Sequence, residues 1–130
     1  MKLMSWNDGL SVGNDHMDSQ HKDIIHLMNM LLKHQSKNTS GSNNEISAIL
    51  SELRIVLARH FIEEEYLLVQ NGCPWAEEHA VDHAYIVSKL SETDVMDVKE
   101  IIGQRIPLLQ NLLESHLAVQ DIDCRDYLFV

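Results

Sequence analysis

Six polar side chains stand at places in this sequence where helical spacing calls for buried apolar residues. They are five histidines and one glutamate: His21, His60, Glu64, His79, His83 and His116. Buried imidazole and carboxylate groups are costly unless they are paired, hydrogen-bonded or bound to a metal. A fold that buries all six must bring them together, and a pair of transition-metal ions is the natural group to hold them.

The apolar spacing predicts an all-α protein. Apolar side chains recur at three- and four-residue steps, and they predict four helices over about 19–37, 45–69, 75–90 and 95–120. Residues 1–17 are expected to form an irregular arm, with Asp18 or Ser19 capping the first helix. Short connections favour antiparallel neighbours, so we expect an up-down-up-down four-helix bundle that makes one domain of residues 1–130.

Prolines and polar runs mark the expected helix boundaries. The polar segment Asn38–Asn44 ends the first predicted helix, and Pro74 suits the first turn of the third. Pro107 lies inside the fourth predicted helix, where it removes a backbone donor. We therefore expect that helix to kink or divide near Gln104–Ile106.

Composition limits the possible partners and location. Twenty acidic against ten basic residues give a formal net charge of -10, which repels nucleic acid and anionic membrane surfaces. The sequence shows neither a secretory signal nor an apolar run of about 18 residues that could span a bilayer. Cys73 and Cys124 fit neither a CxxC motif nor a disulfide-rich scaffold, so both are interpreted as structural or incidental thiols in a reducing cytoplasm.

The remaining histidines do not share the apolar stripes. His26 and His34 fall off the stripe of the first predicted helix, and His16 lies in the arm. We interpret all three as solvated or peripheral, and Glu63 and Glu65 as a solvated acidic face. Any one histidine on a stripe could also be a core residue satisfied by a single hydrogen bond.

The carboxylates differ in how far spacing identifies them. Glu64 lies on the stripe and must be paired, protonated or metal-bound if it is buried. Asp121 follows His116 by five residues, which turns it off the stripe unless the helix ends or distorts there. Spacing alone therefore leaves the choice between Asp121 and Asp123 open.

Sequence motifs along most of the chain resemble those of one known family. They are Trp6, Ser-Val-Gly-Asn at 11–14, Met17–Lys22 with Asn29, His60-Phe-Ile-Glu-Glu64, Gly72-Cys-Pro74, His79-x-x-x-His83, and His116-Leu117 followed by Asp121. Seven candidate ligands in this order and spacing are similar to those of the hemerythrins, in particular the single-domain bacterial form called bacteriohemerythrin.

The resemblance implies two iron ions in a nonheme diiron centre with an oxo or hydroxo bridge. It would place one iron on His79, His83 and His116 and the other on His21 and His60, with Glu64 and Asp121 bridging the two. Iron rests on the resemblance, because histidine and carboxylate ligands suit manganese or zinc equally well. The implied partner is dioxygen, bound reversibly at the iron with fewer ligands for storage, delivery or sensing.

By the same resemblance, apolar side chains would line a dioxygen pocket. They are Ile24, Phe61, Leu113 and Leu117, together with Leu112, and their ordinary interpretation is bundle core. Many members of the family carry a tryptophan at the position of Leu112.

Three other functions stay open at this point. The same centre could serve an enzyme that acts on peroxide, nitric oxide or ferrous iron. It could also serve an interaction module in which oxygenation alters the arm around Trp6. A purely structural bundle fits worst, because empty ligands would leave buried carboxylates uncompensated.

Overall fold

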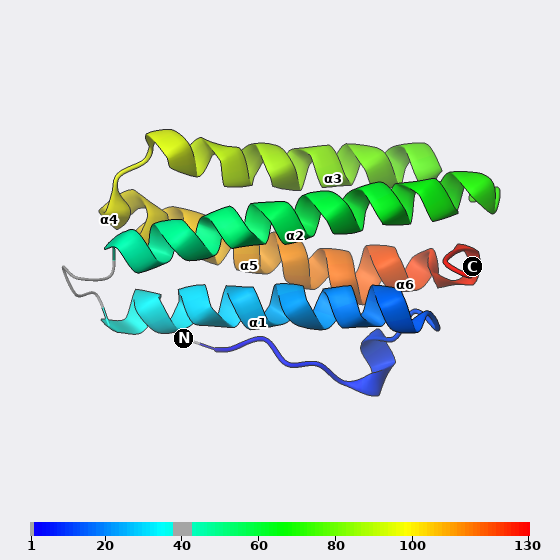
Figure 1. Ribbon diagram of the computed structural model, residues 1–130, viewed down its shortest axis with the longest axis horizontal. Coiled ribbons are helices and arrows are strands. Elements are labelled where there is room, and N and C mark those ends of the chain that lie inside the picture. Colours follow the sequence, from blue (N-terminus) through cyan, green and yellow to red (C-terminus); the bar gives the residue numbers. More distant parts are fainter. Residues whose placement is uncertain (1, 38–42) are drawn as a thin grey trace.

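Four antiparallel helices pack side by side in the computed structural model, which describes residues 2–37 and 43–130 (Figure 1). Residues 38–42 of the predicted connection Asn38–Asn44 lie outside the described residues, whereas residues 43 and 44 begin the second helix instead of preceding it. The first three helices are α1 (Asp15–Lys37), α2 (Asn43–Gln70) and α3 (Ala76–Ser91). The fourth is a continuous helical stretch made of α4 (Val98–Glu100), the π-helix η4 (Ile101–Arg105), α5 (Ile106–Ser115), the π-helix η5 (His116–Gln120) and α6 (Asp121–Asp123). Short 3-10 turns are η1 (Asp8–Leu10), η3 (Glu92–Val95) and η6 (Arg125–Tyr127). The predicted all-α four-helix bundle is confirmed.

The first helix begins earlier than the sequence suggested. Asn14 precedes α1, and its side-chain Oδ1 accepts a hydrogen bond from the Met17 backbone N–H at 3.1 Å. Asp18, the expected cap, instead accepts bonds from the Ser11 hydroxyl (2.6 Å) and the Val12 N–H (2.9 Å). The arm therefore ends at residue 14 rather than 17, because Asn14 satisfies a free helix N–H and Asp18 is used to hold the arm.

The arm lies along α1 (Figure 1). A side-chain amide fixes it there. Asn29 accepts from the Met4 N–H at 2.8 Å and donates to the Met4 carbonyl at 2.9 Å, which pairs the extended backbone as a strand would. Trp6 packs against the core, and the Lys22 ammonium lies 5.0 Å from its ring centre. The N-terminal segment therefore covers one side of the bundle.

The fourth helix begins at Val98 rather than at the predicted residue 95. Asp97 caps it by accepting a hydrogen bond from the Glu100 N–H at 2.8 Å, and Val95 is left in the preceding turn, 89% exposed. Pro107 occupies the second position of α5, directly after η4. The change from π to α geometry at Ile106 lies within the predicted break, and a wider turn accommodates a proline ring that would clash with a regular helix. Pro74 lies in the turn before α3 and not in its first turn.

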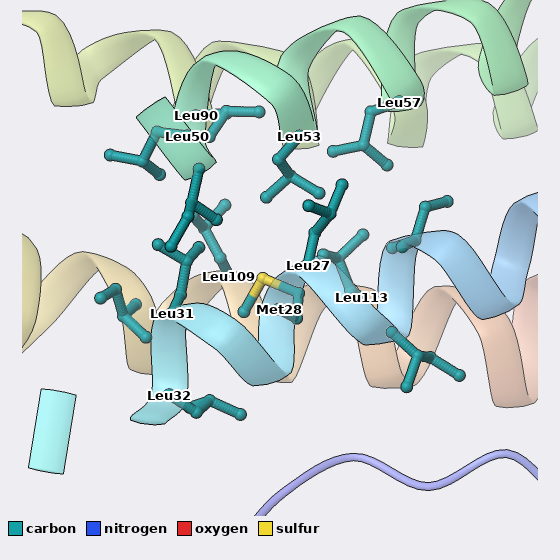
Figure 2. Close-up of a cluster of buried hydrophobic side chains, with 14 of the residues drawn as sticks. Leu27, Met28, Leu31, Leu32, Leu50, Leu53, Leu57, Leu90, Leu109 and Leu113 are labelled. Atoms are coloured by element: carbon teal, nitrogen blue, oxygen red, sulfur yellow. The ribbon is translucent and has the colours of Figure 1, made fainter. Parts of the chain in front are cut away.

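Along the bundle axis, the buried residues form three zones. A large apolar cluster fills the half nearer the α1–α2 connection, with Met28, Leu31, Leu53 and Leu109 completely buried (Figure 2). A smaller apolar cluster closes the opposite end, and it consists of Val12, Met17, Leu68, Cys73, Cys124 and Leu128. On every helix, the polar residues identified in the sequence fall between these two clusters. In the described part of the chain, no helix is both long and apolar enough to cross a membrane.

Candidate metal centre

Every helix of the bundle contributes to one polar cluster. His21 comes from α1, His60 and Glu64 from α2, His79 and His83 from α3, and His116 and Asp121 from the first residues of η5 and α6. Pairs separated by four residues share a helix face, so each of α2 and α3 presents two side chains to the interior. All seven side chains are 3% exposed or less.

The ligand atoms form two groups that share both carboxylates. Glu64, His79, His83, His116 and Asp121 make one group, and His21, His60, Glu64 and Asp121 make the other, with the atoms of each group within 4.8 Å of one another. The structure therefore offers two adjacent sites, one with five protein ligands and one with four.

Each carboxylate directs one oxygen to each site. Glu64 Oε1 lies 3.0 Å from His83 Nε2, and Glu64 Oε2 lies 2.9 Å from His60 Nε2. Asp121 repeats this arrangement, because its Oδ1 lies 3.0 Å from His79 Nε2 and its Oδ2 lies 3.0 Å from His21 Nε2. This is the orientation that a carboxylate needs to bridge two cations.

Outer hydrogen bonds direct the Nε2 atoms of two imidazoles, those of His60 and His83, into the site. His60 Nδ1 donates to Gln20 Oε1 at 2.7 Å, since the Gln20 amide nitrogen is occupied by the Glu63 carboxylate at 2.5 Å. His83 Nδ1 likewise donates to a carboxylate oxygen of Glu65 at 2.9 Å. A neutral imidazole with Nδ1 protonated presents a lone pair at Nε2, which is the form that binds metals.

The inward Nε2 atoms of His60 and His83 each face another imidazole nitrogen. The Nε2 atoms of His21 and His60 are 3.0 Å apart, and so are those of His83 and His116. Among the described residues, the buried oxygens Glu64 Oε2 and Asp121 Oδ2 have no partner in hydrogen-bonding geometry. Nitrogen lone pairs and unsatisfied carboxylate oxygens that converge in this way fit a pair of cations, so the donor set suits the implied metal ions.

Protons can occupy part of the site when metal ions do not. Burial lowers the pKa of His21, but hydrogen bonds that its ring donates to Asp121 and Glu64, together with the negative charges of these carboxylates, outweigh burial and raise the pKa to about 9. The same balance raises the pKa of His79 to about 9 and that of His116 to about 10. Burial raises the pKa of both carboxylates, yet the surrounding histidines hold the pKa below its usual range. Metal ions that enter at neutral pH must therefore displace protons.

A π-helical turn brings Asp121 into the cluster. The Asp121 N–H bonds to the His116 carbonyl, five residues earlier, so that the two side chains face the same side despite their spacing. Asp123 is exposed and lies outside both groups. The helix is therefore distorted between His116 and Asp121, as was required for Asp121 to face the same side as His116.

Comparisons with known proteins agree with this geometry. The family model described as the hemerythrin HHE cation binding domain matches residues 12–121. The chain belongs to the hemerythrin family. It is 27% identical over 122 residues to a bacteriohemerythrin of Campylobacter jejuni, which covers 91% of this chain and 90% of the relative. A bacteriohemerythrin of Stenotrophomonas maltophilia is 30% identical over 92 residues, covering 71% of this chain and 58% of its own length. A bacteriohemerythrin of Pseudomonas aeruginosa is 28% identical over 123 residues, which are 93% of this chain and 78% of the relative.

Four of the five apolar residues predicted for a pocket in this hemerythrin are buried, and one of them contacts the imidazoles. Ile24, Leu113 and Leu117 are 2% exposed or less, whereas Leu112 is only partly buried against the core. The Phe61 ring stacks on His83 with ring centres 3.8 Å apart and also lies 5.5 Å from the ring centre of His116. Phe61 therefore places an apolar ring directly against two of the imidazoles.

Three residues contact the outward-facing Nδ1 atoms of candidate histidine ligands, and the sequence did not identify them. They form the outer layer of the hemerythrin site. Glu65, interpreted as solvated, binds His83 Nδ1, and Gln20 binds His60 Nδ1. Cys124 Sγ lies 3.6 Å from His79 Nδ1. Gln20 and Glu65 lie on different helices from their histidines, and Cys124 follows the last helix, so helix periodicity carries no signal for these contacts.

The histidines outside the stripes stay outside the cluster. His26 is exposed, and His34 faces Glu45 at 3.2 Å. His16 is exposed but joins the outer layer through Glu63, with Nε2 at 2.8 Å from the carboxylate. Gln20 and Glu63 thereby connect His60 to the protein surface.

Proposed function

We propose that this member of the hemerythrin family binds dioxygen reversibly at two iron ions. The observation that carries the proposal is the pair of buried carboxylates, each of which gives one oxygen to a five-ligand group and the other to a four-ligand group. The cation-binding family model and the bacteriohemerythrin names of its relatives support a metal-binding, oxygen-binding protein. Storage, delivery and sensing are all roles for such a protein, and residues 1–130 would form its domain.

The seven residues would be shared between two ions. His79, His83 and His116 would hold one ion, His21 and His60 would hold the other, and Glu64 and Asp121 would be shared by both. The group with His21 and His60 offers one protein ligand fewer, so dioxygen would be expected on that side. A bound diiron pair supplies two electrons to dioxygen and takes them back on release.

The side chains around the ligands set how the site works. Gln20 and Glu65 hold His60 and His83 with Nε2 directed inward, so that little reorganisation is needed when a metal ion binds. Burial lowers the pKa of His60, which favours the neutral ligand form. Ile24, Phe61 and Leu117 exclude water and protons from the reactive side, which favours release of unchanged dioxygen.

We propose a binding role ahead of an enzymatic one. Repeated addition and removal of dioxygen distinguishes the two functions. The iron-loaded, reduced protein is exposed to dioxygen and then degassed while the visible spectrum is recorded. We expect a visible band that appears with dioxygen, disappears on degassing and returns over several cycles. Continuous consumption of dioxygen, peroxide or nitric oxide would replace this function with an enzymatic one.

Matched histidine variants locate the activity. His21→Ala removes one of the ligands proposed for the open ion, and we expect it to abolish the reversible band. His26→Ala changes an exposed histidine on the same helix and should leave the band intact. Loss of the band in both variants would argue against the proposed site.

The location proposed for the chain is the reducing cytoplasm. Both cysteines are free thiols in the structure, which fits a reducing compartment. Dioxygen is the one partner proposed.

A further inference from the structure

Two cysteines from distant parts of the sequence meet at the closed end of the bundle. Cys73 lies in the turn between α2 and α3, and Cys124 directly follows α6. Their Sγ atoms are 4.0 Å apart, although 51 positions separate them in the chain. Both thiols are buried, with Cys73 7% and Cys124 3% exposed.

One of these thiols also touches the candidate metal centre. Cys124 Sγ lies 3.6 Å from Nδ1 of His79, whose Nε2 faces Glu64 and Asp121. The thiol therefore occupies the position that Gln20 has for His60 and Glu65 has for His83. It is the outer partner of a proposed iron ligand.

A surface cleft leads to this thiol. The cleft has a volume of about 450 Å³, and Cys124 and His79 form part of its lining together with Trp75 and Gln120. A small oxidant in the cleft can therefore approach Cys124 without unfolding the bundle. The same opening therefore reaches the Cys124 thiol and the histidine that this thiol contacts.

We propose that Cys73 and Cys124 are a modification site, at which hydrogen peroxide forms a disulfide that releases His79 from its thiol partner. One thiol is first oxidised to a sulfenic acid as peroxide is reduced to water. The second sulfur then attacks the first and displaces a second water, so that two thiols and one peroxide give one disulfide and two waters. A dithiol reductant reverses the reaction.

The geometry requires only a local movement. A disulfide bond is about 2.05 Å long, so side-chain rotation must bring the sulfurs about 2 Å closer. The backbones stay anchored, because the Cys73 N–H bonds to the Leu68 carbonyl and the Cys124 N–H bonds to the Gln120 carbonyl. Movement of Cys124 Sγ toward Cys73 draws it away from His79 Nδ1. Burial raises the pKa of Cys124 to about 12, so the reaction will be slow and will respond to sustained oxidation.

The disulfide should have opposite effects on the fold and on the metal. It links the α2–α3 turn to the end of the last helix, which restricts the unfolded chain and raises the melting temperature of the metal-free protein. Loss of the outer partner of a histidine ligand lowers metal affinity by about 10- to 100-fold. The first effect is independent of the proposed function, whereas the second rests on His79 binding iron.

Disulfide formation is tested first, on the metal-free full-length protein. Incubation with hydrogen peroxide should remove both titratable thiols and lower the intact mass by two hydrogen atoms, without dimer formation, and dithiothreitol should restore both. Thiols that persist while those of the urea-unfolded chain are oxidised would overturn the proposal. Oxidation to sulfinic acid or a disulfide between two chains would also overturn it. A failure of the protein to bind iron leaves this result unchanged.

Iron release then tests the consequence for the centre. Iron-loaded protein, reduced or oxidised at the cysteines, is mixed with a chelator, and we expect about tenfold faster release from the oxidised form. Cys73→Ala keeps the contact between Cys124 and His79 but cannot form the disulfide, so peroxide should not accelerate its release. Equal acceleration in Cys73→Ala, or no acceleration in the wild type, would contradict the proposed effect on His79.

Discussion

The two halves of this bundle use the same four helices for opposite purposes. In the half nearer the α1–α2 connection, the helices meet through hydrocarbon side chains such as Met28, Leu53 and Leu109, all completely buried. One or two turns further along, they meet through imidazoles and carboxylates that are equally buried. The apolar half is stable through the packing of its own side chains and needs no bound group. The polar half has converging lone pairs and unsatisfied oxygens, so it needs cations or protons to be stable.

This difference assigns separate tasks to the two halves. Burial of hydrocarbon provides most of the folding free energy, and it fixes the positions from which the ligands project. The polar half lowers stability unless cations or protons occupy it, because buried carboxylates that face unprotonated imidazoles do not recover the cost of their desolvation. Stability and binding should therefore respond differently to changes in each half.

The largest effect should follow removal of iron. The metal-free protein retains the apolar half but loses the cations that hold the polar half together, so the free energy of unfolding should fall by on the order of 5 kcal/mol. Chemical denaturation with and without iron measures this difference. Hydrogen exchange should rise around His60 and His116 and stay low around Leu53. Equal stability of the two forms would show that the polar half does not depend on metal.

The second effect is a pH dependence confined to the metal-free protein. The pKa of His21, His79 and His116 is raised from 6.5 to about 9 or 10 in the fold. Their contribution to stability is therefore complete below pH 6.5 and is lost as the pH rises through 9 to 10. The carboxylates have a lowered pKa, so their contribution is present above about pH 4.5 and lost in acid.

Melting curves across pH test this account. The metal-free protein should be most stable between about pH 4.5 and 6.5. The iron-loaded protein should show no loss of stability between pH 7 and 9, because iron has replaced the protons. A metal-free protein that is equally stable at pH 6 and pH 10 would contradict the protonated histidines.

A substitution in the apolar half should affect stability without affecting iron. Leu53→Ala removes a completely buried side chain and should lower the free energy of unfolding by about 2–5 kcal/mol in both iron-loaded and metal-free protein. Ile55→Ala, two residues away and 65% exposed, is the matched control and should change stability by less than about 0.5 kcal/mol. Loss of iron from Leu53→Ala at temperatures where it is folded would show that the two halves are not separable.

A substitution outside the ligands should affect iron more than stability. Gln20→Ala leaves His60 Nδ1 without its hydrogen-bond acceptor and should weaken iron binding by about 10- to 100-fold, as chelator competition would show. His16→Ala removes only the exposed end of the same chain of contacts and should have a smaller effect. If both variants bind iron as the wild type does, Gln20 does not orient His60.

The smallest effect is expected at Leu112. This side chain is partly buried, and Leu112→Trp adds an aromatic ring to the proposed dioxygen pocket. We expect slower decay of the oxygenated spectrum, by less than about tenfold or ~1.4 kcal/mol in the barrier. Decay at an unchanged or faster rate would place the pocket elsewhere.

Regular geometry explains what could be predicted from the sequence. The histidines and Glu64 stood on apolar stripes, and a helix that buries its stripe buries them as well. The family resemblance added Asp121, which spacing could not choose over Asp123. The structure supplies the missing reason, since a π turn after His116 changes the side that Asp121 faces.

Competition between similar signals explains what was missed. Asn14 and Asp18 are both suitable helix caps, and only the path of the arm decides that Asp18 binds Ser11 and Val12. At the fourth helix, Asp97 rather than the apolar pattern sets the start. Glu65 and Cys124 contact histidines on other helices, so their roles depend on how the helices pack.

The number of iron ions bound per chain tests the account most directly. Metal-free protein would be loaded with ferrous iron under anaerobic conditions, desalted and analysed for iron and protein. Two ions per chain are predicted, because Glu64 and Asp121 each turn one oxygen to each group of histidines. One ion per chain, or none, would contradict a polar half built around a metal pair.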